Sequence, residues 1–343
     1  MNFTRRDLLK VAAAAGVVSI IPKIANAQVA NIEKRSLTIA VGGQALVYYL
    51  PLSIADLKGF FKEEGLNVKV VDFAGGSKAL QAVVGGSADV CSGAFEHTIS
   101  LQNRRQGYSA FVMQGRAPMI TLGVSSKNMP DYKEPADLKG KKIGVTAPGS
   151  STNMLVNFFL SQHGLSASDV SIIGVGAGTG AVNAMRSGQI DAISNVDPVI
   201  STLEHEGLLN PIVDTRKLKD SEEIFGGPMP SSCLYASHKF IEENPNTCQA
   251  LANAIIKADK WIQEASLEEI MKTVPEQYLL GNPDVYRRAL EASLEALSPD
   301  GTIAADGPQT ALKALDAFND DIKADSIDLS KVWTDQFVKK ASS

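Results

Sequence analysis

The sequence predicts an α/β protein made of two similar lobes, each a mainly parallel sheet flanked by helices, with a helical C-terminal tail. Short apolar runs alternate with stretches of helical periodicity, and parallel strands need the long connections that helices supply. The same pattern restarts 102 residues further along the chain. Hydrophobic residues make up 44% and charged residues 21% of the 343 residues, a balance typical of globular domains.

The first unit combines buried strands with helices that follow glycine-rich turns. Its predicted strands span residues 37–41, 65–71, 88–91, 108–114 and 120–124. Its predicted helices span residues 46–58, 77–84 and 94–105. Glycine pairs at 42–43 and 85–86 mark the end of a strand and the end of a helix, because glycine is a strong local breaker of regular structure.

The second unit repeats this order. Its predicted strands span residues 142–145, 170–175 and 190–194, and its predicted helices span residues 151–163, 180–187 and 199–206. Segments 77–90 and 179–192 align without a gap: a hydroxyl residue opens a helix, a glycine closes it, and a short strand surrounds an aspartate. Two copies so far apart indicate two similar lobes rather than solenoid units, although chance matching of Ala and Gly is the alternative.

The C-terminal part is predicted to be almost entirely helical, over residues 247–265, 284–297 and 308–323. Before it, a strand at 232–237 could return the chain to the first sheet. We therefore expect lobe one to comprise residues 36–125 plus 231–343, and lobe two to comprise residues 126–230.

The first 27 residues read as an export signal. Paired Arg5 and Arg6 precede an apolar run at 11–21, and small residues at 25–27 suit cleavage near Ala27. The adjacent arginines are typical of the twin-arginine route. The alternative, a membrane anchor, needs about 20 apolar residues, and this run has only 11. We expect a soluble periplasmic protein after cleavage.

Charge and cysteine usage exclude several classes of function. The net charge is −5 and no basic patch occurs, so no nucleic-acid partner is expected. Cys91, Cys233 and Cys248 lack CxxC spacing, and the four histidines form no HxxxH pair, so no metal site is expected. Cys91 and Cys233 lie in apolar runs and are predicted to be buried small hydrophobes.

The loops that follow the predicted strands are rich in glycine, hydroxyl and amide residues, which can hold an anion at helix N-termini. Helix capping alone is the alternative for each loop. The candidate ligand-binding residues in these loops are Gln44, Gly76, Ser77, Ser150, Ser151, Thr152, Thr179, Asn195 and Asp197. The convergence of such loops on one face favours a ligand cleft.

Further candidates are aromatic or charged. Tyr48, Tyr49 and Phe95 could stack on a flat ligand, with core packing as the alternative. Arg116, at a strand end, could grip a carboxylate or sulfonate, unless it is a plain surface arginine. Glu96 and His97 are also candidate ligand-binding residues: Glu96 could pair with Arg116 or His97, or accept a hydrogen bond from a ligand amino group.

One pattern favours an enzyme instead. Residues 176–181 fit a loose G-x-G-x-x-A fingerprint, with Asp197 downstream, as in dinucleotide-dependent oxidoreductases. The matching turn at 74–77 in the first copy lacks the fingerprint, however. No G-x-S-x-G and no P-loop motif occurs. We therefore expect no cofactor and no catalytic activity.

Several segments resemble the periplasmic solute-binding proteins of ABC importers, in the branch for nitrate, taurine, aliphatic sulfonates and thiamine precursors. These segments are residues 41–43, 59–68, 73–77, 85–90, 137–145, 187–192 and 197–198. The resemblance implies a two-lobed, type II-like fold that closes on its ligand, with hinge crossings near 125–127 and 230–232. It also implies delivery to an ABC permease in the inner membrane.

The resemblance places the pocket at Gln44, at residues 76–77, 93–96 and 150–152, and at Thr179 and 195–197. The Phe95-Glu96-His97 run and the paired tyrosines depart from the sulfonate binders, which puts simple alkyl sulfonates and nitrate in doubt. We expect a small organic anion of the sulfonate or aromatic carboxylate class. The alternatives are a thiamine-type pyrimidine precursor, an exported oxidoreductase and a sensor-domain partner.

Overall fold

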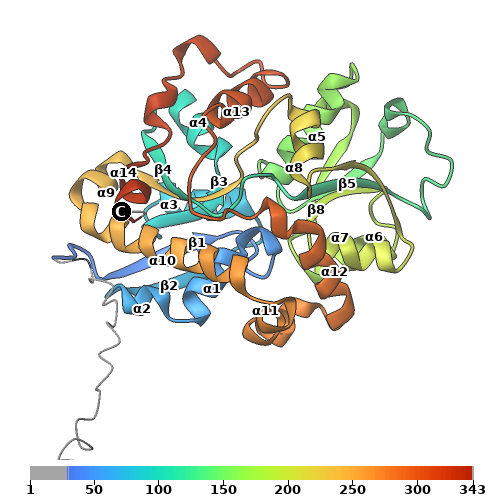
Figure 1. Ribbon diagram of the computed structural model, residues 1–343. Helices are drawn as coiled ribbons and strands as arrows, with labels where there is room; N and C mark the ends of the chain where they lie inside the picture. The colour runs from blue at the N-terminus through green and yellow to red at the C-terminus, as the bar shows by residue number, and fades with distance from the viewer. Residues whose placement is uncertain (1–28, 30, 342–343) are drawn as a thin grey trace, which may run out of the picture.

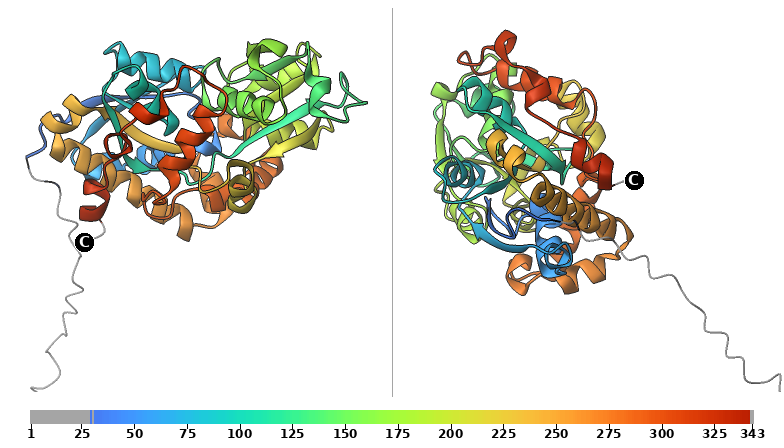
Figure 2. Two further views of the ribbon diagram at one scale, coloured as in Figure 1. Left: turned by 90° about the horizontal axis from the view of Figure 1, so that it is seen from above. Right: turned by 90° about the vertical axis from the view of Figure 1, so that its left-hand side faces the viewer.

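The computed structural model describes residue 29 and residues 31–341. The predicted export signal and its cleavage site at Ala27 lie outside the described residues. Among the residues that are described, the helices are all too short or too polar to cross a membrane. The chain folds into two lobes that lie side by side, with C-terminal helices packed against both (Figures 1 and 2).

The first lobe is built on a five-stranded sheet with the order β2-β1-β3-β10-β4. Strands β1 and β2 and strands β1 and β3 pair in parallel, whereas β10 is antiparallel to both β3 and β4. Its strands are β1 (Ser36–Val41), β2 (Asn67–Asp72), β3 (Val90–Ala94), β4 (Tyr108–Met113) and β10 (Ser232–Ser237). The strand predicted at 232–237 therefore does return the chain to the first sheet.

The second lobe repeats this topology, with the order β7-β6-β8-β5-β9. Here β6 is parallel to β7 and β8, and β5 is antiparallel to β8 and β9. Its strands are β5 (Ile120–Ser125), β6 (Lys142–Val145), β7 (Ser171–Gly174), β8 (Ala192–Val196) and β9 (Leu209–Asp214). The matching order confirms the two similar α/β lobes predicted from the repeat.

Strand β5 differs from the expectation, because the sequence-based boundary at residue 125 leaves it in lobe one. In the structure the chain leaves the first sheet after β4 and crosses within 114–119, and β5 then fills the antiparallel position of the second sheet. Strand β10 fills the same position in the first sheet after the return crossing. Two adjacent apolar strands carry no local signal of which sheet they join, so the pattern alone placed the crossing too late.

Helices cover both faces of each sheet (Figure 1). Lobe one carries α1 (Leu50–Leu57), α2 (Phe60–Glu63), α3 (Gly76–Val84) and α4 (Glu96–Asn103), and lobe two carries α5 (Ser151–Gln162), α6 (Thr179–Arg186), α7 (Val199–His205) and α8 (Leu218–Phe225). Most of these helices follow directly on a strand, so their N-termini lie at the carboxyl ends of the strands. That edge of each sheet faces the other lobe.

The C-terminal tail connects the lobes. Its helices are α9 (His238–Glu243), α10 (Pro245–Glu264), α11 (Leu267–Thr273), α12 (Pro283–Ser293), α13 (Gly307–Asp316) and α14 (Gln336–Ala341). Helix α10 packs on α1 and α2, whereas α12 packs on α7 of lobe two and α13 contacts both α4 and α5. The tail was expected in lobe one alone, but its amphipathic helices find apolar partners on both lobes.

Candidate functional site

A small cavity lies between the lobes, where the strand-end loops of both sheets meet. Its volume is about 10 Å³, which is room for a single water molecule. We call it the inner cavity; it is lined by Gly42, Leu46, Tyr48, Tyr49, Gly76, Thr146, Ser150, Ser151, Thr152 and Val196. None of these lining residues carries a charge, and hydroxyl groups supply most of the polar surface.

Direct contacts between the lobes close the inner cavity. The Ser77 backbone N–H donates to Ser150 Oγ at 3.0 Å, and Ser77 Oγ donates to the Pro148 carbonyl at 2.8 Å. At a second point the Val47 N–H donates to the Asp197 carbonyl at 3.0 Å. An organic solute needs far more space than one water, so the lobes must separate before it can enter.

Tyr48 and Tyr49 form the aromatic wall of the inner cavity. Their rings meet edge to face at 4.8 Å between centroids, and both side chains are buried. Burial, followed by the nearby Glu96 carboxyl for Tyr48, raises the pKa of both hydroxyls well above the usual value near 10. Both tyrosines therefore keep their protons and can act as hydrogen-bond donors. Both tyrosines line the inner cavity and also belong to the hydrophobic core, so ligand binding by them stays a prediction.

The hydroxyl groups of lobe two are partly used within their own loop. Thr152 Oγ1 accepts from the Thr146 N–H at 3.1 Å and lies 2.9 Å from Thr146 Oγ1. Asn153 Oδ1 accepts from the Gly149 N–H at 2.9 Å. These bonds fix the loop that precedes α5. The Ser150 side chain makes no capping hydrogen bond at the start of this helix, and ligand binding by the loop stays a prediction.

Glu96 and His97 are buried at the start of α4. Glu96 is 3% exposed, its Oε1 has no hydrogen-bond partner among the described residues, and burial raises its pKa to about 7. His97 Nδ1 lies 3.1 Å from the Tyr235 hydroxyl. Burial lowers the pKa of His97 to about 4 although the Gly149 backbone acts in the opposite direction, so the ring is neutral at pH 7.

Asp197 has a structural partner that the sequence analysis missed. Its Oδ2 lies 3.4 Å from the Arg216 guanidinium, which also binds Glu204 and Asp214. Its Oδ1 accepts from the Ser201 N–H at 2.8 Å, and Ser293 Oγ of the tail lies 3.4 Å from Oδ2. Burial raises the pKa of Asp197, and Arg216 acts against this. Only the folded second lobe reveals Arg216 as the partner, because Arg216 follows β9 and lies 19 residues further along the sequence than Asp197, which follows β8.

Other predicted residues lie apart from the inner cavity. Gln44 and Thr179 are outside its lining, and Phe95 is fully buried in the core. Asn195 uses its amide within lobe two, donating to the Gly176 carbonyl at 3.1 Å. The fingerprint at 176–181 thus lies on the loop after β7, an edge strand of the second sheet.

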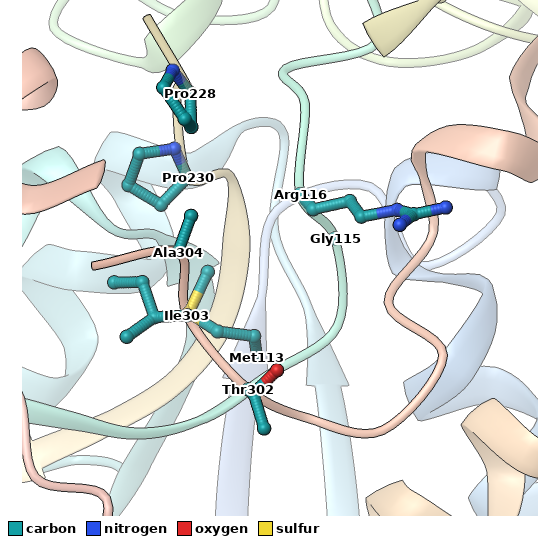
Figure 3. A pocket seen from close by; sticks show the side chains of 8 residues that line it. All are labelled: Met113, Gly115, Arg116, Pro228, Pro230, Thr302, Ile303 and Ala304. Carbon is teal, nitrogen blue, oxygen red and sulfur yellow. The ribbon is translucent and has the colours of Figure 1, made fainter. Parts of the chain in front are cut away.

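Arg116 does not reach the inner cavity either. Its side chain is exposed, its Nε donates to the Glu295 carbonyl at 3.0 Å, and it does not pair with Glu96. It lies at a separate small cavity next to the lobe crossing, and its guanidinium points away from the other lining residues (Figure 3). The geometry therefore does not support the prediction that Arg116 binds a ligand in the cleft.

The cysteines are all buried and unpaired, as predicted for Cys91 and Cys233. Within the described part of the chain, His, Cys, Asp and Glu form no group of three or more that could hold a metal ion.

A sequence model of the NMT1-like family matches residues 30–274. The chain belongs to the NMT1-like family. YtlA of Bacillus subtilis (strain 168), which is provisionally named a binding protein, is 25% identical over 259 residues, 74% of this chain and 75% of its own. The 4-amino-5-hydroxymethyl-2-methylpyrimidine phosphate synthase of Aspergillus parasiticus is 26% identical over 272 residues, 77% of each chain.

Solved structures share the fold. A protein of Bordetella bronchiseptica RB50 is 66% identical, with a TM-score of 0.90 over 91% of this chain and 98% of its own. The nitrate-binding protein NrtA from Synechocystis PCC 6803 has a TM-score of 0.71 at 16% identity, covering 91% of this chain and 89% of its own. The alkanesulfonate-binding protein SsuA from Xanthomonas axonopodis pv. citri, solved with MOPS, has a TM-score of 0.67 at 21% identity, covering 85% and 94%. The predicted resemblance and the periplasmic-binding-protein fold are confirmed.

Proposed function

We propose that this NMT1-like protein is the periplasmic solute-binding component of an ABC uptake system and binds a small organic anion between its lobes, without catalysis. The fold and the names of the similar proteins support this role. Binding proteins for nitrate and for alkanesulfonates share the architecture, and a provisionally named binding protein is 25% identical over 259 residues.

The lining of the inner cavity carries the proposal. It holds hydroxyl groups and tyrosines but no carboxylate. Helices α3 and α5 begin at Gly76 and Ser151, so two helix N-termini adjoin it. Helix N-termini and uncharged donors favour an anion, since they satisfy its charge without a competing negative group.

Closure follows from the two lobes and their crossings. The chain passes between the sheets within 114–119 and again between β9 and β10. A solute that contacts the strand-end loops of both lobes, which we call the rims of the cleft, stabilises the closed arrangement. The size of this effect is set by how much more tightly it binds the closed arrangement than the open one. The permease would then recognise the closed shape, and the solute would leave unchanged.

Thermal-shift screening tests the proposal, with taurine, benzoate and 4-amino-5-hydroxymethyl-2-methylpyrimidine as probes. A bound anion should raise the melting temperature, and the rise should grow with the logarithm of its free concentration once that exceeds the dissociation constant. Tyr48→Phe and Ser151→Ala should reduce that shift, whereas Tyr132→Phe, outside the inner cavity, should leave it unchanged. If the anions fail and the purified protein carries no small molecule in native mass spectra, the proposal is wrong.

A pyrimidine precursor is the second candidate, because of Glu96. This buried carboxyl has a free oxygen and lies near both cavity tyrosines. An aminopyrimidine could donate to it, and a relative is named as a pyrimidine phosphate synthase. Calorimetry separates the two: Glu96→Gln should weaken the binding of an aminopyrimidine and leave benzoate binding unchanged.

A further inference from the structure

A second and much larger pocket lies outside the Ser77–Ser150 contact. Its volume is about 700 Å³, within the range of small-molecule sites. Its walls come from α3 and α4 of lobe one, from α5 of lobe two and from the end of α13, which Figure 1 shows between α4 and α5. We call it the outer pocket. Ser150 lines both the inner cavity and the outer pocket, so the two lie on either side of this contact.

The outer pocket is elongated. Along α3 it is lined from Ser77 to Gly85, and along α4 from His97 to Arg104. At a rise of 1.5 Å per residue, these stretches are about 10–12 Å long. Six apolar side chains contribute to its walls: Leu80, Val84, Leu101, Met154, Leu315 and Phe318.

The two ends of the outer pocket differ in chemistry. His97 is 4% exposed at the inner end. The Gly149 backbone lies close enough to act on its pKa, but Nε2 makes no hydrogen bond of ordinary length and angle in the part of the chain that the structure describes. Arg104 lies seven residues later on the same helix, at the outer end, and forms no ion pair with any described residue. No Asp or Glu lines the pocket. Its one permanent charge is therefore the guanidinium.

We propose that the outer pocket is a second solute site, which binds an elongated organic anion with its acid group at Arg104, its apolar body along α3 and α4, and its far end at His97. This site does not depend on the inner cavity, because it is present while the lobes are in contact. Its cation also differs from the one expected from the sequence, since Arg116 lies at the lobe crossing.

Octanoate is a suitable probe, because a chain of eight carbons is about 10 Å long at C–C bonds of about 1.5 Å. Calorimetry should show that it binds the wild-type protein and that Arg104→Gln weakens binding by about tenfold, the loss of one charge-assisted contact. Arg105→Gln is the matched control, since Arg105 is the adjacent arginine, is exposed as Arg104 is, and does not line the pocket. It should bind octanoate as the wild type does.

Two reciprocal variants separate this proposal from the proposed function. Tyr48 lines the inner cavity and not the outer pocket, whereas Arg104 lines the outer pocket and not the inner cavity. Tyr48→Phe should weaken the binding of taurine or benzoate and keep octanoate, and Arg104→Gln should do the reverse. The outer site is ruled out if octanoate does not bind the wild type, binds Arg104→Gln equally well, or is weakened as strongly by Tyr48→Phe as by Arg104→Gln. Loss of taurine or benzoate binding alone leaves the outer site standing.

Discussion

The two lobes bury an acid at equivalent places, just after the third strand of each repeat, but only one acid is paired. In lobe two, Asp197 follows β8 and lies against Arg216. In lobe one, Glu96 is the second residue after β3, whereas Asp197 is the first residue after β8. The Glu96 Oε1 has no hydrogen-bond partner among the described residues. Burying a carboxyl group without a partner lowers the stability of the folded state, so its presence at this position points to a functional role. The paired acid holds lobe two and the tail together, whereas the unpaired acid is free to meet a ligand.

Elsewhere the lobes match closely. Asp89 Oδ2 accepts from the Thr38 N–H at 2.8 Å, and Asp191 Oδ2 accepts from the Lys142 N–H at 2.9 Å. Each aspartate thus ties the end of a repeat helix to the first strand of its own sheet. The repeat conserves this scaffold contact in both copies, while the rims that face the cleft have diverged.

Removing the cation of the paired acid should have the largest effect. Arg216→Met leaves Asp197 buried without compensation, which should lower the free energy of unfolding by about 3–5 kcal/mol in urea denaturation. The control is Arg186→Met, which breaks an exposed pair with Glu206 and should cost about 1 kcal/mol or less. Equal costs would show that burial of the Arg216 network contributes nothing.

Neutralising the unpaired acid should change the pH dependence of stability. Because the Glu96 pKa rises from its usual 4.5 to about 7 in the folded state, wild-type stability should fall as pH rises from 4.5 to 7. At 1.36 kcal/mol per pKa unit the loss is about 3 kcal/mol. Glu96→Gln should abolish this loss and be more stable than the wild type at pH 8, but not at pH 4. Parallel urea-denaturation profiles across this range would contradict the burial argument.

Replacing a glycine by alanine in the strand-end loop of lobe one should hinder closure of the cleft, whereas the same replacement in lobe two should not. A Cβ at Gly75 would lie 2.8 Å from Ala147 Cβ of the other lobe, whereas a Cβ at Gly178 meets nothing within 4 Å. Overpacking of this kind costs about 1–3 kcal/mol, so Gly75→Ala should weaken cleft binding about tenfold or more. It should also enlarge the radius of gyration in X-ray scattering. Gly178→Ala should match the wild type, and an equal effect of both would refute the asymmetry of the rims.

The smallest effect is expected where the lobes agree. Asp89→Asn weakens the bond to the Thr38 N–H and the partly exposed ion pair with Lys34, and Asp191→Asn weakens the bonds to the Lys142 N–H and to the Asn128 amide. Each substitution should cost about 1 kcal/mol. Chemical denaturation of the two variants measures this. If the repeat is structural, the two costs should agree within about 0.5 kcal/mol; a cost confined to one variant would argue that the matched segments play different roles.

The repeat made much of the fold predictable. Strands such as 142–145 and helices such as α10 follow from periods of burial that are local in the sequence. The site was harder: Tyr48, Ser150 and Gly76 do line the inner cavity, since strand-end loops of parallel sheets share one edge. Arg116 lies elsewhere, because the crossing between lobes falls earlier than its strand pattern indicates. Arg216 and Arg104 carry no local motif at all.

The sequence alone determined the α/β class, the duplication and the loops from which a cleft is built, because these depend on residue spacing and turn chemistry. Tertiary structure decided which sheet β5 joins, which acid is paired, and where the space for a solute lies. Those outcomes depend on contacts between residues far apart in the chain, such as Ser77 with Ser150 and Asp197 with Arg216. No pattern along the chain encodes a distance between two lobes.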